Sequence, residues 1–289
     1  MSTNSHPDQS RPMNCGSLEC TLTSYATARI PNDDIVPLRK QSDTLPGNLG
    51  NSVLRHSDEQ TLTALVAIKD AFARFESPPE HFQDWGVVFS SRYLGRTAFA
   101  QSLNKFAVDG PWNVSVQVVP NRSLHSPASM LGLAMGCHGP CVGVGGGLDG
   151  ETDAWLTATS LLDQHAVPGI WLVFSGWEPD EQIDTMGTPL IQASCTALVL
   201  ALQPATAANG LAQMRIVYDP TAPVALEVPA TVTAMTLFEN FMAAGNPEQG
   251  MTAFLGGGLR AELEWSAAFE QTIPLRMRSL ISPPQKKAA

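Results

Sequence analysis

The sequence has 289 residues, of which 44% are hydrophobic, so it is long enough to bury a full core in one large domain or two small ones. Its net charge of -10 argues against a broad surface for nucleic acid or for an anionic membrane. Only 15% of the residues are charged, which indicates that a partner chain covers part of the surface. No apolar run reaches the roughly 18 residues that a membrane span needs.

The cysteines and the two ends of the sequence give further expectations. There are five cysteines, an odd number that argues against a disulfide framework and favours a reducing cytoplasm. Residues 1–17 are polar and lack an apolar signal core, so we expect a disordered leader. A single domain is expected over residues 18–270, followed by a flexible tail over residues 271–289.

The first half of the domain alternates between strand and helix patterns. Apolar alternation predicts a strand at 18–30, and Ser57 with Gln60 forms a capping box for a helix at 58–75. The patterns that follow predict a strand at 85–90, a helix at 94–106, a short strand at 114–120 and a helix at 127–135.

A strand-helix-strand unit lies at the centre, in residues 136–178. It consists of an apolar strand at 141–144, a glycine turn at 145–150, a helix at 151–165 and a second apolar strand at 170–175. The two strands are expected to lie parallel in one buried sheet with a right-handed crossover. Further strands are predicted at 194–203 and 214–218, a helix at 231–244, and a closing strand with a glycine bulge at 253–265. This order predicts a layered α/β fold.

The glycine turn precedes a helix N-terminus, where many α/β enzymes hold a nucleophile or an anion. Residues 145–150 contain no Cys, Ser, Lys or His. They match a G-x-G-x-x-G pattern, so a nucleotide- or acyl-CoA-binding enzyme is an alternative. The expected acidic residue would fall near Ile170, inside the second strand, and the first acid at that strand's end is Glu178.

Two local clusters have simpler interpretations. Cys137, His138 and Cys141 lack a fourth metal ligand, so we interpret the two thiols as small apolar residues and predict no metal. We interpret Asp149 and Glu151 as carboxylates that stabilise the helix N-terminus through the helix dipole, rather than as catalytic groups.

The segment Pro120–Glu178 resembles the N-terminal half of β-ketoacyl synthases, members of the thiolase-like superfamily. The features that carry this resemblance are Asn121, Pro127-Ala128, Gly136, Gly139-Pro140, Val142, Gly150 and Ser175-Gly176-Trp177-Glu178. The resemblance extends over about residues 18–205. It implies an α/β, layered thiolase-like (half-thiolase) fold with a mixed central sheet between helices.

The same resemblance implies that the catalytic groups are missing. The family's nucleophilic cysteine falls on Leu148, flanked by Gly147 and Asp149, and no histidine follows His165 to activate a malonyl group. The glycines in Leu255–Gly258 resemble a remnant of the loop that closes an active site. The sequence thus resembles a shortened chain length factor, a non-catalytic partner of an active β-ketoacyl synthase in fatty-acid-like, polyketide or polyene biosynthesis.

The resemblance also implies where partners bind. In this family the strand before the nucleophile turn pairs across a two-fold axis with its counterpart, which places the partner at Gly139, Pro140, Cys141, Val142, Gly143 and Val144. Trp155 is interpreted as a core or interface aromatic, with the lining of a ligand tunnel as the alternative. Arg122 and His125 are candidates for contact with an acyl carrier protein, with a solvated loop as the alternative. No cofactor and no nucleic acid are expected.

Overall fold

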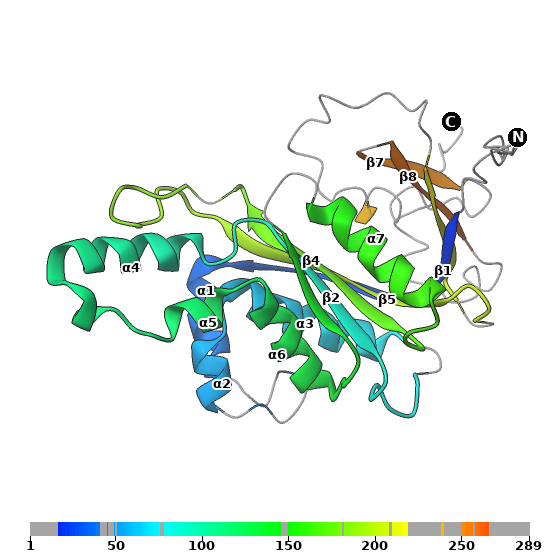
Figure 1. Cartoon of the computed structure of the whole chain (residues 1–289), viewed down its shortest axis with the longest axis horizontal. Coiled ribbons are helices and arrows are strands. Elements are labelled where there is room, and N and C mark those ends of the chain that lie inside the picture. Colours follow the sequence, from blue (N-terminus) through cyan, green and yellow to red (C-terminus); the bar gives the residue numbers. More distant parts are fainter. Residues whose placement is uncertain are drawn as a thin grey trace, which may run out of the picture.

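The computed structural model describes residues 17–40, 45, 49, 51–75, 78–145, 150–180, 182–207, 210–218, 238–239, 250–256 and 258–265. These residues form one eight-stranded sheet in the order β3-β2-β4-β5-β1-β6-β8-β7 (Figure 1). The strands are β1 (Leu18–Pro31), β2 (Gly86–Ser91), β3 (Cys141–Gly145), β4 (Ile170–Glu178), β5 (Ser194–Pro204), β6 (Ala212–Tyr218), β7 (Met251–Gly256) and β8 (Leu259–Trp265). The helices are α1 (Asn32–Leu38), α2 (Asn51–His56), α3 (Glu59–Ala73), α4 (Arg96–Asp109), α5 (Val118–Arg122), α6 (His125–Met135) and α7 (Gly150–Asp163), with a 3-10 turn η2 at Pro111–Asn113.

The sheet is mixed, as the α/β prediction requires. Strands β3, β2 and β4 are parallel, and every other neighbouring pair is antiparallel. The predicted parallel relation of β3 and β4 is confirmed, with β2 inserted between them. Because parallel strands end at the same edge, the carboxyl ends of β2, β3 and β4 meet where α7 begins.

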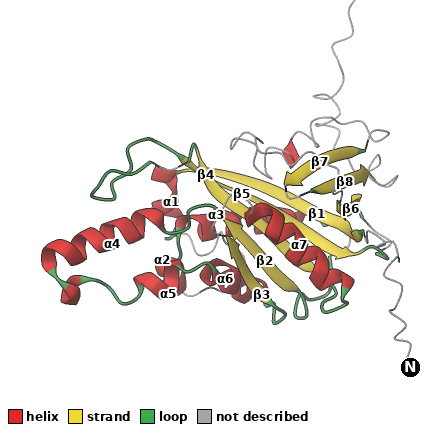
Figure 2. Cartoon of the chain, turned by 45° about the horizontal axis from the view of Figure 1, so that its top comes forward, coloured by secondary structure: helices red, strands yellow, loops and turns green. Residues whose placement is uncertain are grey.

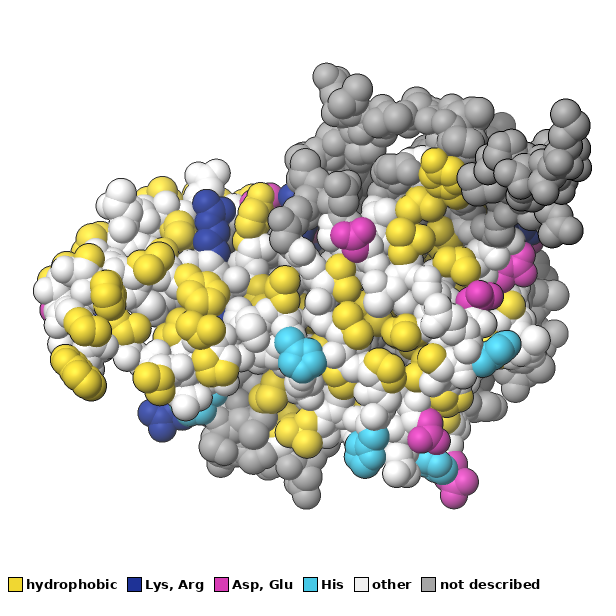
Figure 3. All heavy atoms as spheres, in the orientation of Figure 1, with side chains coloured by type: hydrophobic (Ala, Val, Ile, Leu, Met, Phe, Trp, Pro, Cys, Tyr) yellow, Lys and Arg dark blue, Asp and Glu magenta, His cyan; other side chains and the backbone are white. Residues whose placement is uncertain are grey.

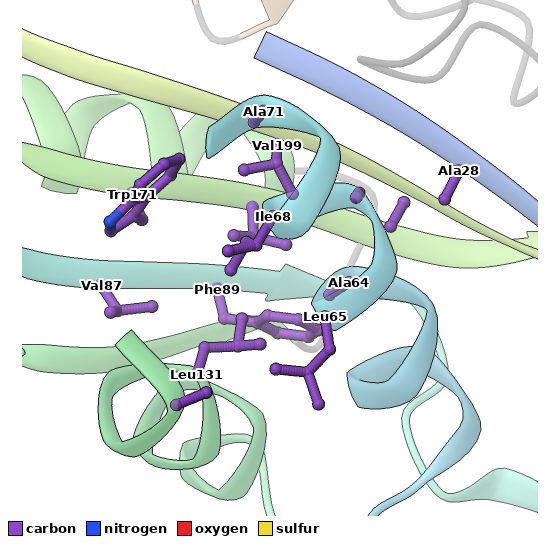
Figure 4. Packing of buried hydrophobic residues seen from close by; sticks show 14 of the residues in the cluster. Ala28, Ala64, Leu65, Ile68, Ala71, Val87, Phe89, Leu131, Trp171 and Val199 are labelled. Atoms are coloured by element: carbon purple, nitrogen blue, oxygen red, sulfur yellow. The ribbon is translucent and has the colours of Figure 1, made fainter. Parts of the chain in front are cut away.

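Helices cover both faces of the sheet, and the alternation of side chains along each strand feeds two cores. In β4, Trp171 and Val173 join the core beneath α3 and α6, whereas Leu172 and Phe174 join the core beneath α7. Figure 2 shows α3 and α6 on one side of the strands and α7 on the other. Figure 4 shows the first core, where Ile68 and Leu65 of α3 meet Phe89 and Leu131.

The second core extends beyond the parallel strands. Met214 and Ile216 of β6 and Ala261 and Leu263 of β8 belong to the same buried cluster as Trp155 of α7. The antiparallel half of the sheet therefore supplies apolar cover that α7 needs, in addition to that from β2, β4 and β5.

The start of α3 corrects one prediction. Asp58, rather than Ser57, is the N-cap residue, and its Oδ1 accepts a hydrogen bond from the Thr61 backbone N–H at 2.9 Å. The Asp58 carboxyl also accepts a bond from the Thr61 hydroxyl at 2.5 Å. Ser57 and Asp58 are both good cap residues, so only the backbone geometry distinguishes them.

The strand predicted at 114–120 is wrong. Residues 118–122 form the short helix α5, which with α4 and η2 makes an arm that projects from the body on the left of Figure 1. We call residues 96–122 the arm. No residue of α4, η2 or α5 is buried, so the β-branched valines of this segment have no neighbouring strand or core to pack against.

The closing strand predicted at 253–265 is also wrong as a single strand. It is a hairpin of β7 and β8, with Gly258 in the turn at a φ of +78°, a value that favours glycine. Of the helix predicted at 231–244 only Phe238 and Glu239 are described, and they are helical. Phe238 is buried against Tyr25, with the ring centroids 5.0 Å apart. Within the described ranges, no helix is both long and apolar enough to cross a bilayer.

Candidate functional site at the carboxyl ends of the parallel strands

The predicted nucleophile position lies between the end of β3 and the start of α7. Leu148, Gly147 and Asp149 fall outside the described residues, but both ends of the turn are described. A Cβ atom on Gly150 would lie 3.3 Å from the Gly145 Cα, so the start of α7 contacts the end of β3 directly. The turn therefore begins and ends at one point on the edge of the sheet.

The polar side chains at this edge form hydrogen bonds with side chains and backbone carbonyls of the same chain. The Ser91 hydroxyl donates to Gln60 Oε1 at 2.5 Å, and Gln60 Nε2 donates to the Arg92 carbonyl at 3.1 Å. The Ser175 hydroxyl donates to the Thr196 carbonyl at 2.7 Å. These groups hold β2, β4 and β5 to their neighbours, which is a structural role.

A small hollow lies beside the start of α7 in the described part of the chain. Its volume is about 20 Å³, and Arg92, Glu151, Phe174 and Trp177 are among the residues that line it. This is room for about one water molecule. Glu178, the acid that a dinucleotide site would use, forms an ion pair with Arg29 at 2.5 Å. Neither of these two features favours a nucleotide site, but residues 146–149 of the turn lie outside the described residues, so the alternative stays a prediction.

The four described cysteines are free thiols. Burial raises the pKa of Cys20 to about 12, and burial followed by the neighbouring Cys141 raises the pKa of Cys137 to about 12. Burial also raises the pKa values of Cys141 and Cys195. Since the thiolate is the nucleophile, none of these four thiols is prepared for attack at neutral pH. Among the described residues there is no group of three or more His, Cys, Asp or Glu that would hold a metal ion.

Strand β3 is an edge strand and its residues are half-buried, rather than interior as its apolar sequence predicts. The Pro140 carbonyl accepts a hydrogen bond from the Val87 N–H at 2.8 Å, on the side of β2. Because backbone groups alternate along a strand, Val142 and Val144 also point their N–H and C=O groups towards β2. The backbone groups of Cys141 and Gly143 therefore point to the outer edge, where no strand pairs with β3 in the described part of the chain.

The glycines in and before β3 make room for other parts of the same chain. A Cβ atom on Gly143 would lie 1.9 Å from the Leu124 carbonyl oxygen, and one on Gly139 would lie 2.5 Å from the Trp85 carbonyl oxygen. The close backbone approach at Gly143 is thus made by the residues that lead into α6, on one face of the strand. Pairing of the outer edge with a partner is a separate matter and stays a prediction.

The remaining candidate residues lie in different places. Trp155 is 6% exposed and packs on Phe174 with the ring centroids 5.1 Å apart, inside the α7 core. His125 is at the start of α6 and its ring shares a 2.9 Å hydrogen bond with the Ser129 hydroxyl. Arg122 ends α5 and pairs with Glu59 at 3.4 Å, so it contacts the body of the protein instead of a solvated loop.

The arm has an exposed apolar surface that the sequence patterns did not predict. Six large side chains there are more than half exposed: Leu103, Phe106, Val108, Trp112, Val116 and Val119. Figure 3 shows hydrophobic side chains gathered over this part of the molecule. The sequence sign of such a surface is a predicted helix with several large apolar residues and no predicted strand next to it that could cover them.

The fold has a counterpart among solved structures. One chain of a ketosynthase (ApeO) in complex with its chain length factor (ApeC) from Xenorhabdus doucetiae matches with a TM-score of 0.53 and 15% identity, over 86% of this chain and 99% of that chain. The ishigamide ketosynthase/chain length factor matches with a TM-score of 0.47 and 17% identity, over 70% and 68% of the two chains. A β-ketoacyl synthase from Burkholderia phymatum STM815 matches at 0.46 and 13%, over 68% and 62%.

Only the first of these TM-scores exceeds 0.5, and at 15% identity it shows a shared fold. No protein-family model matches the sequence. No curated protein matches it either. The fold is therefore thiolase-like, the architecture of the ketosynthases, and the match covers nearly the whole of one chain of the ApeO and ApeC complex. The predicted α/β, layered thiolase-like fold is confirmed.

Proposed function

We propose that this chain is a non-catalytic, ketosynthase-like subunit of the chain length factor type, which pairs with an active β-ketoacyl synthase in fatty-acid-like, polyketide or polyene biosynthesis. The observation that carries the proposal is the outer edge of β3, with which no strand of the described residues pairs, in a thiolase-like fold whose arm exposes large apolar side chains. An unpaired strand edge and exposed apolar side chains are both costly in an isolated protein, and a partner chain satisfies both.

The missing chemistry supports a non-catalytic role. At the position of the family's attacking cysteine the chain has Leu148, whose side chain forms no thioester, and it has no histidine after His165. The four described thiols have raised pKa values, so none of them replaces the missing thiolate.

The proposed interface combines backbone and side-chain contacts. The outward N–H and C=O groups of Cys141 and Gly143 would pair with a strand of the partner. The six apolar side chains of the arm would pack on the partner's surface, as in large interfaces of obligate complexes. Leu148 would fill space with aliphatic volume and help to close the partner's acyl tunnel. We place this complex in the cytoplasm, where the free thiols stay reduced.

Co-expression tests the proposal. The chain is produced with the β-ketoacyl synthase encoded nearest to its gene, and the complex is analysed by size-exclusion chromatography with light scattering. We expect a one-to-one heterodimer that survives dilution. A mixture in which the two chains elute separately would refute the pairing, and acyl transfer by this chain alone would refute the non-catalytic role.

A pair of variants locates the interface. Trp112 in the arm is 96% exposed and Tyr218 at the end of β6 is 49% exposed, so replacing either by Ala leaves the folded chain intact. A buried interface tryptophan typically contributes about 2 kcal/mol or more, so Trp112→Ala should weaken pairing by about thirtyfold. Tyr218→Ala should leave it unchanged. Equal effects of the two substitutions would remove the arm from the interface.

A further inference from the structure

A polar cleft lies where the arm joins the body of the protein. Its volume is about 360 Å³, within the range of small-molecule sites. Its lining comes from distant parts of the chain: Asn32, Arg39, Asp58, Glu59, Gln60, Gly95, Arg96, Thr97, Ala98, Gln101, Arg122, Trp177 and Pro189. The cleft shares Trp177 with the small hollow beside α7, and Gln60 of the same sheet edge lines it too, so the two lie next to each other. Its other polar lining residues, among them Arg39, Thr97 and Arg122, do not line that hollow.

Positive charge dominates the cleft. Arg39, Arg96 and Arg122 line it, and a single carboxylate, that of Glu59, bridges Arg39 and Arg122. The other acid, Asp58, is 1% exposed and its two oxygens accept bonds from Thr61. Burial raises the pKa of Asp58, while its bonds from Thr61 and the nearby charge of Arg122 act in the opposite direction. The guanidinium groups therefore outnumber the carboxylates that oppose them.

Two buried hydrogen-bond donors in the cleft have no acceptor among the described residues. In the described part of the chain, Arg39 Nε and Thr97 Oγ1 are buried polar atoms with no hydrogen-bond partner. Each such atom costs about 1–3 kcal/mol unless something satisfies it. Both belong to residues that line the same cleft, which has room for a ligand with acceptor oxygens.

Two helices also begin at the cleft. Gln60 is near the start of α3, and Arg96, Thr97 and Ala98 form the first turn of α4. Gly95 precedes α4 and makes no side-chain cap bond, so no cap side chain occupies the N-terminus of that 14-residue helix. Helix N-termini carry partial positive charge that favours an anion.

From these four features we propose that the cleft binds a small oxyanion, such as the carboxylate or phosphate group of a metabolite, held by Arg39, Arg122 and Thr97. Glu59 occupies the two guanidinium groups in the free protein and competes with the ligand for them. A bound anion connects the end of α1, where Arg39 lies, with Thr97 of α4 and Arg122 of α5, and so fixes the arm to the body. This inference does not depend on pairing with a ketosynthase.

Thermal unfolding of the full chain tests the proposal with inorganic phosphate and with malonate as probes. Sodium chloride at equal ionic strength controls for general screening. We expect at least one probe to raise the melting temperature in a saturable way, because it binds only the folded state. The two probes distinguish a phosphate site from a carboxylate site. Hydrogen exchange with the effective probe should slow in residues 96–122.

Matched variants separate the cleft from net charge. Arg122→Gln should weaken binding about tenfold, whereas Arg215→Gln on β6 removes the same charge and should have no effect. Glu59→Gln should tighten binding about fivefold because it removes the competitor. Glu19→Gln changes the net charge equally and should not, since Glu19 lies at the opposite end of the long strand β1 from Asn32.

One further variant protects the test against misfolding. Thr97→Val keeps the shape of the side chain and removes a hydroxyl that has no partner, so it should fold normally and weaken binding about threefold. The proposal is overturned if neither probe exceeds chloride. It is equally overturned if Glu59→Gln and Glu19→Gln change the affinity alike, or if Thr97→Val and Arg122→Gln both bind as the wild type does.

Discussion

Replacing Gly143 by alanine separates contacts inside the chain from contacts with a partner. A Cβ atom at this position would lie 1.9 Å from the Leu124 oxygen, 2.3 Å from its carbonyl carbon and 2.8 Å from the His125 nitrogen. Ordinary contact begins near 3.4 Å, so the backbone before α6 has to move by about 1.5 Å. All three obstructing atoms are backbone atoms, and they cannot move without displacing α6 from the sheet.

The expected cost is at the upper end of the range for overpacking, about 3 kcal/mol in the free energy of unfolding. For a chain of this size that corresponds to a fall in melting temperature of about 6–12 °C. The matched control is Gly176→Ala in β4, where the nearest atom of the described residues to the added Cβ is Arg92 Cβ at 3.8 Å. That control should lie within about 0.5 kcal/mol of the wild type, with any change towards greater stability.

Urea unfolding of the two variants and the wild type, followed by circular dichroism, measures these differences. If Gly143→Ala is as stable as Gly176→Ala, the close packing of the residues before α6 on β3 is not present. The inner face of β3 would then be free for a partner, and the assignment of pairing to its outer edge would lose its basis.

Two further predictions follow from the buried titratable groups. Burial raises the pKa of Asp58 above its ordinary value of 3.8, so the folded chain holds this proton more tightly than the unfolded chain, and stability falls as pH rises through the raised pKa. Asp58→Asn keeps a good N-cap residue and should gain stability relative to the wild type as pH rises above the ordinary pKa of 3.8, as measured by urea unfolding at each pH. A pH-independent difference, or one of opposite sign, would contradict this. Because the pKa of Cys137 is raised to about 12 and that of Cys141 is also raised, neither thiol should react with iodoacetamide in the native protein near pH 7.5, whereas both should react in urea; peptide mass spectrometry reads the result. Rapid native labelling of Cys137 would contradict its described burial.

The interior strands were predictable because their chemistry is local. The apolar runs at the centres of β2, β4 and β5 are buried from both faces, and such strands are continuous in sequence. Strand β3 has the same apolar pattern but lies at the edge, since no pattern within one strand says how many neighbours it has. The strand predicted in the arm was wrong because local preference was overridden by the surroundings. Val118 and Val119 favour a strand, but they lie in the short helix α5 with no strand of the described residues beside them.

The polar cleft could not be predicted from sequence patterns. Arg39, Glu59, Thr97 and Arg122 come from four segments that no spacing rule connects, and only the packing of α4 and α5 against the start of α3 brings them together. The predicted loss of the nucleophile, in contrast, depends on one position, Leu148, which lies outside the described residues and stays a prediction. The strand and helix on either side of it, β3 and α7, are both present where they were expected.

The central claim is that this chain pairs with an active ketosynthase and takes no acyl group itself. Native mass spectrometry of the two chains, incubated together with an acyl thioester, reads both parts of the claim in one spectrum. The account predicts a one-to-one complex that dissociates in the gas phase to an acylated ketosynthase and an unmodified partner of this sequence. Acyl mass on this chain, or two chains that never appear together, would contradict it.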